Sequence, residues 1–143
     1  MPTDVYATIS EVAPAIQERL ADVLEMRVSN PRQRAMWHAY LSAIEFPSQA
    51  RVLEIGCGTG VVTRMLAQWP GVGQTIGVDP SPVFIAKART LAQGIPNLTF
   101  EEGDGRSLQF EANAFDVAVV HQALSHVPQP ERLVAEALRV LQP

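Results

Sequence analysis

Residues 52–60 read Val-Leu-Glu-Ile-Gly-Cys-Gly-Thr-Gly and join a short apolar run to three glycines at alternate positions. Valine, leucine and isoleucine favour a buried strand, whereas glycine accepts a positive φ and lets a ligand approach bare backbone. We expect the following residues, 59–69, to form a helix whose free N–H groups face the same crevice. The stretch therefore predicts a strand, a ligand-binding turn and a helix in succession.

The spacing of the glycines separates two kinds of nucleotide-binding turn. A dinucleotide-binding turn needs a third small residue at the position that Val61 occupies when counting starts at Gly56. Valine at this position disfavours a nicotinamide-dependent oxidoreductase but leaves it as an alternative. A glycine-rich turn that binds no ligand is a second alternative.

Strand and helix signals alternate through the rest of the chain. Strands are expected at 51–55, 74–78, 98–102 and 116–120, and helices at 59–69, 81–93 and 130–141. Such alternation is typical of a parallel sheet with right-handed crossovers. Two amphipathic helices are expected earlier, over 10–29 with Ser10 as N-cap, and from Pro31 to about residue 44. The predicted fold is α/β, a Rossmann-like, doubly wound and largely parallel sheet preceded by two helices.

The composition excludes several classes of protein. The chain has 143 residues, of which 47% are hydrophobic and 18% charged, with a formal net charge of -4. A negative charge without a basic run argues against a nucleic acid as the main partner. No apolar run approaches the roughly 20 residues that span a membrane, and the N-terminus does not resemble a secretory signal. We therefore expect a cytoplasmic protein without a membrane span.

The single cysteine, Cys57, cannot form an intramolecular disulfide, and we interpret it as a small structural residue between two glycines. No cluster of histidine, cysteine and acidic residues has the spacing of a metal site, so no metal is expected.

Two acidic residues follow predicted strands. If 51–55 and 74–78 are neighbouring parallel strands, Asp79 lies beside the glycine turn, where its carboxylate could accept from both hydroxyls of a ribose. A turn residue before Pro80 is the alternative. Asp104, between Gly103 and Gly105, places another carboxylate at the same edge of the sheet, with a solvated turn residue as its alternative.

With Glu54 ahead of the glycines, residues 54–60 resemble the first motif of class I methyltransferases, which bind S-adenosylmethionine. Residues 115–121, Phe-Asp-Val-Ala-Val-Val-His, and the following Gln-Ala-Leu-Ser-His-Val-Pro resemble the fourth motif of that family. The resemblance is greatest to the small-molecule branch that includes the ubiquinone and menaquinone biosynthesis methyltransferases. It covers residues 48–143 and implies an S-adenosylmethionine-binding domain there, after an N-terminal helical segment at 1–47.

The resemblance also implies roles for particular residues. Asp104 would accept from the adenine amino group, and His121 would border the methionine part of the cofactor. Cofactor contacts are expected from a set spread over four strand ends: Glu54, Gly56, Cys57, Gly58, Gly60, Asp79, Pro80, Asp104, Gly105 and His121. His121 and His126 are the candidate catalytic bases, although methyl transfer depends mainly on alignment of the reacting atoms.

The implied activity is methyl transfer to a small-molecule acceptor whose identity the sequence does not show. The Asn-Pro-Pro-Tyr motif of methyltransferases that modify DNA or protein glutamine is absent. A non-catalytic interaction module with the same fold is the alternative from another functional class.

The end of the sequence leads to a further expectation. Residues 138–143, Leu-Arg-Val-Leu-Gln-Pro, resemble the family segment that normally precedes three further strands. The resemblance therefore implies a truncated chain with a partial sheet of strand order 3-2-1-4. Strand 116–120 would then be an apolar edge, and we expect a homodimer through it unless the N-terminal helices cover the vacant side.

Overall fold

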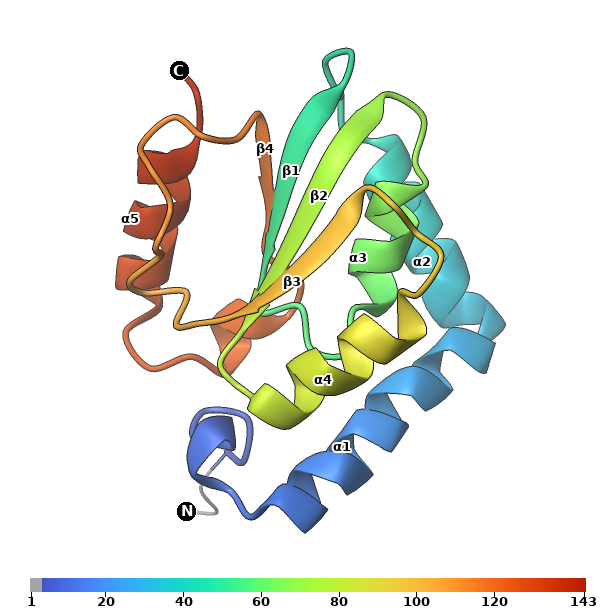
Figure 1. Cartoon of the computed structure of the whole chain (residues 1–143), viewed down its shortest axis with the longest axis vertical. Helices are drawn as coiled ribbons and strands as arrows, with labels where there is room; N and C mark the ends of the chain where they lie inside the picture. Colours follow the sequence, from blue (N-terminus) through green and yellow to red (C-terminus); the bar gives the residue numbers. More distant parts are fainter. Residues whose placement is uncertain (1–3) are drawn as a thin grey trace.

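The computed structural model describes residues 4–143 and contains one parallel sheet. Its four strands are β1 (Ala50–Ile55), β2 (Val72–Asp79), β3 (Leu98–Glu102) and β4 (Val117–Val119). They lie in the order β3-β2-β1-β4 (Figure 1). The predicted order is confirmed, and it brings the carboxyl ends of all four strands to one edge of the sheet.

Helices cover both faces of the sheet, which confirms a doubly wound α/β fold. They are α1 (Pro14–Met26), α2 (Pro31–Ser42), α3 (Val61–Ala67), α4 (Pro82–Leu91) and α5 (Pro130–Val140). Three short 3₁₀ turns, η1 (Ile9–Glu11), η2 (Arg27–Ser29) and η3 (Ala123–Ser125), complete the described elements. In Figure 1, α5 lies on one side of the sheet, and α2 and α3 lie on the other.

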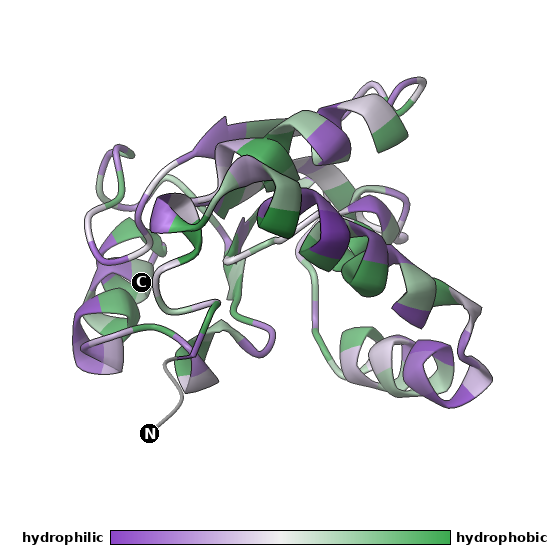
Figure 2. Cartoon of the chain, turned by 90° about the horizontal axis from the view of Figure 1, so that it is seen from below, coloured by the Kyte–Doolittle hydropathy of each residue, from purple (hydrophilic) through white to green (hydrophobic). Residues whose placement is uncertain are grey.

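The alternation of side chains along β1 explains this layering. Leu53 and Ile55 belong to the apolar core under α5, whereas Val52 belongs to the core formed with α2 and α3. A strand buried on both faces is rich in apolar residues, and β1 carries Val52, Leu53 and Ile55 besides the buried Glu54. Colouring by hydropathy shows that the surrounding helices carry both hydrophilic and hydrophobic residues, as expected for elements with one buried side (Figure 2).

The helix starts differ from the sequence predictions in two places. The helix after the glycine turn starts at Val61 rather than at 59, because Gly60 has a φ of 85° and occupies the N-cap. The first helix starts at Pro14 rather than at residue 10, and its N-cap is Ala13 with no side-chain hydrogen bond. The prediction that Ser10 caps this helix is therefore wrong, because Ser10 lies within η1.

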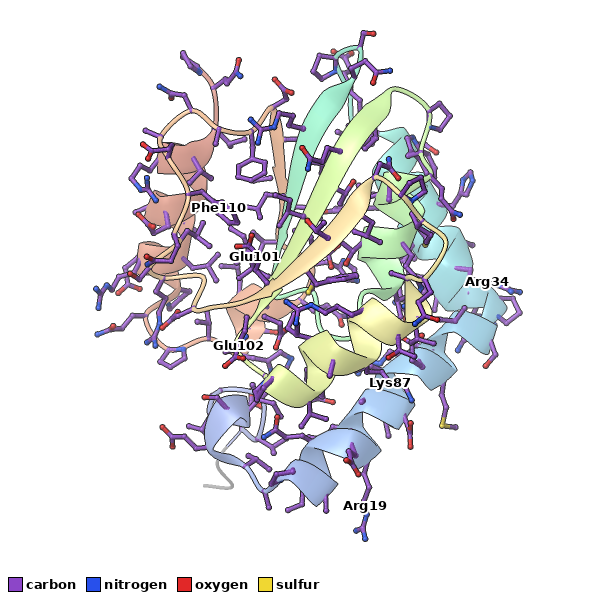
Figure 3. All side chains as sticks on the ribbon, in the orientation of Figure 1. Arg19, Arg34, Lys87, Glu101, Glu102 and Phe110 are labelled. Atoms are coloured by element: carbon purple, nitrogen blue, oxygen red, sulfur yellow. The ribbon has the colours of Figure 1, made fainter. Side chains whose placement is uncertain are left out.

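The start of α4 agrees with the prediction. The Ser81 hydroxyl accepts a hydrogen bond from the Phe84 N–H at 3.0 Å, and Pro82 occupies the first helical position. The same hydroxyl donates to Gln17 Oε1 at 2.6 Å, which ties α4 to α1. An ion pair of 3.0 Å between Lys87 and Asp22 joins these helices at the surface, and Figure 3 labels Lys87 on α4.

The edge strand β4 is shorter and less exposed than the predicted strand 116–120. Asp116 precedes the strand, and its carboxylate accepts from the Arg51 N–H at 2.8 Å. Val119 is buried in the core that contains Trp37 of α2, and the other residues from 116 to 120 are half-buried. The edge expected at 116–120 is therefore half-buried, with Val119 covered by α2 as in the alternative that the N-terminal helices lie over it. Within residues 4–143, no helix has the length and apolarity to cross a membrane.

Candidate functional site

The glycine turn forms the floor of the site. Gly56 and Gly58 have φ values of 73° and 57°, which residues other than glycine rarely adopt. The N–H groups of Gly56 and Cys57 both donate to the Val78 carbonyl, at 2.8 and 3.0 Å. This bond pair fixes the turn against the end of β2. A Cβ atom added to Gly56 would lie 2.5 Å from Ala123 Cβ, so the turn also requires glycine for close packing.

Asp79 is the last residue of β2 and is 6% exposed. Its carboxylate accepts from the N–H of Gly58 at 2.9 Å and from the N–H of Ser81 at 2.9 Å. Burial raises the pKa of Asp79 from 3.8 to about 6, although these two N–H groups act in the opposite direction. The carboxylate is therefore positioned by the glycine turn and retains lone pairs for a ligand.

Asp104 lies after β3 in a more open environment. Its carboxylate forms an ion pair of 2.8 Å with Arg106, and its side chain is 45% exposed. The hydrogen bond from Arg106 keeps the pKa of Asp104 below its usual value. A ligand amine that approaches Asp104 would therefore share this carboxylate with Arg106.

The strand ends enclose a cavity of about 310 Å³. Eight of the residues singled out in the sequence line it: Gly56, Gly58, Asp79, Pro80, Asp104, Gly105, His121 and His126. Residues 6–11 of the N-terminal segment also contribute to its wall. The volume falls at the lower end of the range of about 300–1,000 Å³ for small-molecule sites.

A smaller cavity of about 80 Å³ adjoins the first. It is lined by the candidate site residues that the larger cavity lacks, with the exception of Gly60. Glu54 and Cys57 line it, and both are buried. Burial raises the pKa of the Glu54 carboxyl and of the Cys57 thiol well above their usual values. Glu54 Oε2 has no hydrogen-bond partner within residues 4–143, so one buried oxygen is left for a ligand or a water molecule.

Gly60 lines neither cavity. A Cβ atom there would lie 2.6 Å from Cζ of Phe100, so Gly60 allows α3 to pack closely against β3.

His121 follows β4 and lines both cavities. The Trp37 indole N–H donates to His121 Nε2 at 2.9 Å. Because an indole N–H can only donate, Nε2 must carry a lone pair, and in the neutral ring the proton is on Nδ1. Burial, with the nearby Arg27 charge, lowers the pKa of His121. In this geometry His121 offers a hydrogen-bond donor, and a role as base through Nε2 would require loss of the Trp37 bond.

Residues of the N-terminal segment contact the side chain of His126. Its Nδ1 lies 2.6 Å from Oδ2 of Asp4, and its ring centroid lies 5.0 Å from that of Tyr6. These contacts link the segment before α1 to the segment after β4. His126 is thereby engaged by residues that sequence reasoning had not connected with the site.

Another N-terminal residue, Glu25, contacts the glycine turn from the end of α1. Its carboxylate accepts from the Thr59 hydroxyl at 2.5 Å and from Arg64 Nη2 at 2.6 Å.

Sequence reasoning missed Arg27, Trp37, Gln122 and residues 6–11 as parts of the site. Trp37 and His121 are separated by 84 positions in the chain, and no local pattern predicts such a contact. A tryptophan in the helix before the strand that leads into the glycine turn was the available signal, but a core role explains it equally well. Within residues 4–143, no group of three or more potential ligand residues could hold a metal ion.

Residues 52–143 match the family described as Methyltransferase domain. The chain belongs to this family. The matched range starts inside β1 and includes the glycine turn, Asp79, Asp104 and the segment after β4. The family resemblance seen in the sequence is thereby confirmed, and S-adenosylmethionine is the cofactor that the family implies.

Two curated relatives of this methyltransferase domain act on small molecules, judging from their names. The trans-aconitate 2-methyltransferase of Deinococcus radiodurans is 39% identical over 94 residues, covering 66% of this chain and 34% of the relative. The ubiquinone/menaquinone biosynthesis C-methyltransferase of Zymomonas mobilis is 26% identical over 121 residues, covering 84% of this chain and 50% of the relative. The chain thus spans half of these relatives or less.

A solved structure agrees with this assignment. The S-adenosylmethionine-dependent methyltransferase from Mesorhizobium loti has a TM-score of 0.67 and 28% identity, covering 76% of this chain and 50% of that one. The polar groups of the methyltransferase domain also fit the implied cofactor. Asp79 presents a carboxylate suited to a diol, and Glu54 presents an unpartnered buried oxygen in the adjoining cavity.

Proposed function

We propose that this chain forms the cofactor-binding part of an S-adenosylmethionine-dependent methyltransferase that acts on a small molecule. The observation that carries the proposal is the convergence of the glycine turn, Asp79, Asp104 and His121 on one cavity at the carboxyl ends of the strands. Ligands of open α/β sheets bind at this edge, at the switch point between β1 and β4 where the strand order changes direction.

In this proposal Asp79 binds the ribose hydroxyls, with its orientation set by the N–H groups of Gly58 and Ser81. Asp104 receives the adenine amino group, and Gly105, in the same cavity wall, offers its backbone beside it. The glycine turn with Cys57 and Pro80 would contact the rest of the cofactor, and Glu54 would act from the smaller cavity.

The cofactor supplies an electrophilic methyl group on a sulfonium. The protein then has to hold the acceptor in line with that methyl group, an effect worth about 7–11 kcal/mol when the geometry is ideal. His121 and His126, which both line the larger cavity, are the candidates for contacting the acceptor. With its proton on Nδ1, His121 would orient an acceptor by donating a hydrogen bond. His126 would have to leave Asp4 before it could accept a proton.

Isothermal titration calorimetry with S-adenosylhomocysteine tests the proposal. We expect saturable binding with one site per chain and no detectable binding of NADH. Absence of heat with S-adenosylhomocysteine would reject the assignment, and enhanced NADH fluorescence would favour an oxidoreductase instead. Stable self-association without cofactor binding would favour a non-catalytic interaction module.

A homodimer through 116–120 also remains part of the proposal. Within residues 4–143, β4 pairs with β1 on one side, and only an isolated bridge between Phe115 and Leu141 lies at its other side. Light scattering at tens of micromolar protein would test this, and a monomer would contradict it. A cytoplasmic location is proposed together with the function.

A further inference from the structure

Arg27 lies where the two cavities meet. It caps the C-terminal end of α1 and begins η2, and it lines both the larger and the smaller cavity. The two cavities also share Gly56, Gly58 and His121. A group bound by Arg27 would therefore lie beside the glycine turn and beside the ring that follows β4.

Among residues 4–143, no carboxylate forms an ion pair with Arg27. Its Nη1 donates to the Gln122 side-chain oxygen at 3.1 Å. Arg106, the other arginine in the wall of the larger cavity, is paired with Asp104. A guanidinium has five N–H donors in a planar fork, so Arg27 keeps donors available for an incoming anion.

Gln122 places this guanidinium at some conformational cost. It has a φ of 65°, in the left-handed region that residues other than glycine rarely adopt. Strained backbone of this kind is concentrated at ligand sites, where the surrounding structure maintains it. The strained residue and the uncompensated cation therefore form one unit in the wall of the cavity.

We propose that Arg27, held by Gln122, binds a carboxylate of a small-molecule ligand at the junction of the two cavities. A planar carboxylate matches the guanidinium fork. A phosphate fits less well, because it concentrates two negative charges on one group beside the acidic Glu54 and Asp79, while Arg27 supplies a single positive charge. The inference rests on the proposed function, in which two molecules could supply the carboxylate: the methionine part of the cofactor or an acidic methyl acceptor.

Calorimetry with the variant Arg27→Gln separates these sources. Arg19→Gln is the matched control, because Arg19 extends from the same helix into solvent, away from the cavities (Figure 3). S-adenosylhomocysteine carries the α-carboxylate, whereas 5′-methylthioadenosine has the same nucleoside and thioether without it. Succinate, titrated into protein saturated with S-adenosylhomocysteine, tests a carboxylate of the acceptor, with succinamide as the uncharged comparison.

If the cofactor supplies the carboxylate, Arg27→Gln lowers the affinity for S-adenosylhomocysteine by about 10- to 150-fold and leaves the affinity for 5′-methylthioadenosine unchanged. If the acceptor supplies it, both nucleosides bind as before, and the wild type binds succinate while Arg27→Gln does not. In either case Arg27→Lys, which keeps the charge but not the fork, gives an intermediate affinity, and Arg19→Gln behaves as the wild type.

Equal affinity of the wild type and Arg27→Gln for S-adenosylhomocysteine, together with no succinate binding that depends on Arg27, would overturn the inference. This failure differs from a failure of the proposed function, in which the wild type itself binds neither nucleoside. The succinate titration, repeated on the protein alone, still decides the anion site in that event. Thermal unfolding of each variant identifies a folding defect, and Arg27→Lys provides the second comparison if Arg27→Gln is unfolded.

Discussion

Replacing Asp79 by asparagine removes a buried charge while preserving the size of the side chain. At neutral pH the ionised carboxylate can accept from both ribose hydroxyls, and hydrogen bonds to a charged group contribute about 1.5–3 kcal/mol each. Asparagine has one acceptor oxygen, which must already serve the N–H of Gly58 or of Ser81. We expect Asp79→Asn to lower the affinity for S-adenosylhomocysteine by about 10- to 100-fold at pH 7.5.

The pH dependence of binding should change as well. Because the pKa of Asp79 is about 6 in the free protein, the carboxyl becomes protonated as the pH falls below that value. Ligand hydroxyls favour the ionised form, so affinity in the wild type should fall by up to about tenfold per pH unit below 6. The affinity of Asp79→Asn should lack this decrease.

Stability should respond in the opposite direction. A pKa raised from 3.8 to about 6 means that the folded protein holds a proton that the unfolded chain has lost between these pH values. This group therefore stabilises the fold less as the pH rises from about 4 to about 6, by about 3 kcal/mol in total. Asp79→Asn should lose this part of the pH dependence.

Calorimetry at pH 5, 6 and 7.5 and urea unfolding at pH 4.5 and 7 measure both effects. Asp22→Asn is the matched control, because Asp22 is exposed at the surface in its ion pair with Lys87. Equal affinities of Asp79→Asn and the wild type at pH 7.5, or parallel pH profiles, would refute the reasoning for Asp79.

Two further substitutions test the supporting contacts. Ser81→Ala removes the helix cap that accepts from the Phe84 N–H and also the hydrogen bond to Gln17. It should lower the free energy of unfolding by about 1–3 kcal/mol in urea titrations, and an unchanged midpoint would contradict this. Trp37→Phe removes the N–H that stabilises the neutral ring of His121, so the pKa of His121 should rise in an NMR titration. A pKa that stays the same or falls would show that the hydrogen bond is not formed in solution.

The strand order and the position of the site were accessible from sequence because they depend on local patterns. The apolar run before Gly56 and the acid after each of the next two strands are short-range signals. Parallel topology then brings their ends together without further information. For the same reason the Ser81 cap, with Pro82 after it, was predicted correctly.

The N-terminal part of the site could not be predicted in this way. Arg27 reaches Gln122 across 95 positions, and Asp4 reaches His126 across 122. Such contacts depend on how α1 and α2 pack against the finished sheet, which amphipathic patterns alone do not determine. The left-handed backbone of Gln122 is likewise imposed by tertiary contacts, because glutamine has no intrinsic preference for it.

The contact of Glu25 with Thr59 and Arg64 has a thermodynamic consequence. Because it joins the end of α1 to the glycine turn, the free energy of ordering the first helix and the free energy of filling the cavity are coupled. Such coupling is reciprocal: a ligand that rigidifies the turn protects α1 against hydrogen exchange by the same factor by which an ordered α1 tightens that ligand. Helix α1 would then regulate affinity through the Glu25 carboxylate, in addition to the part that residues 6–11 play in the wall of the larger cavity.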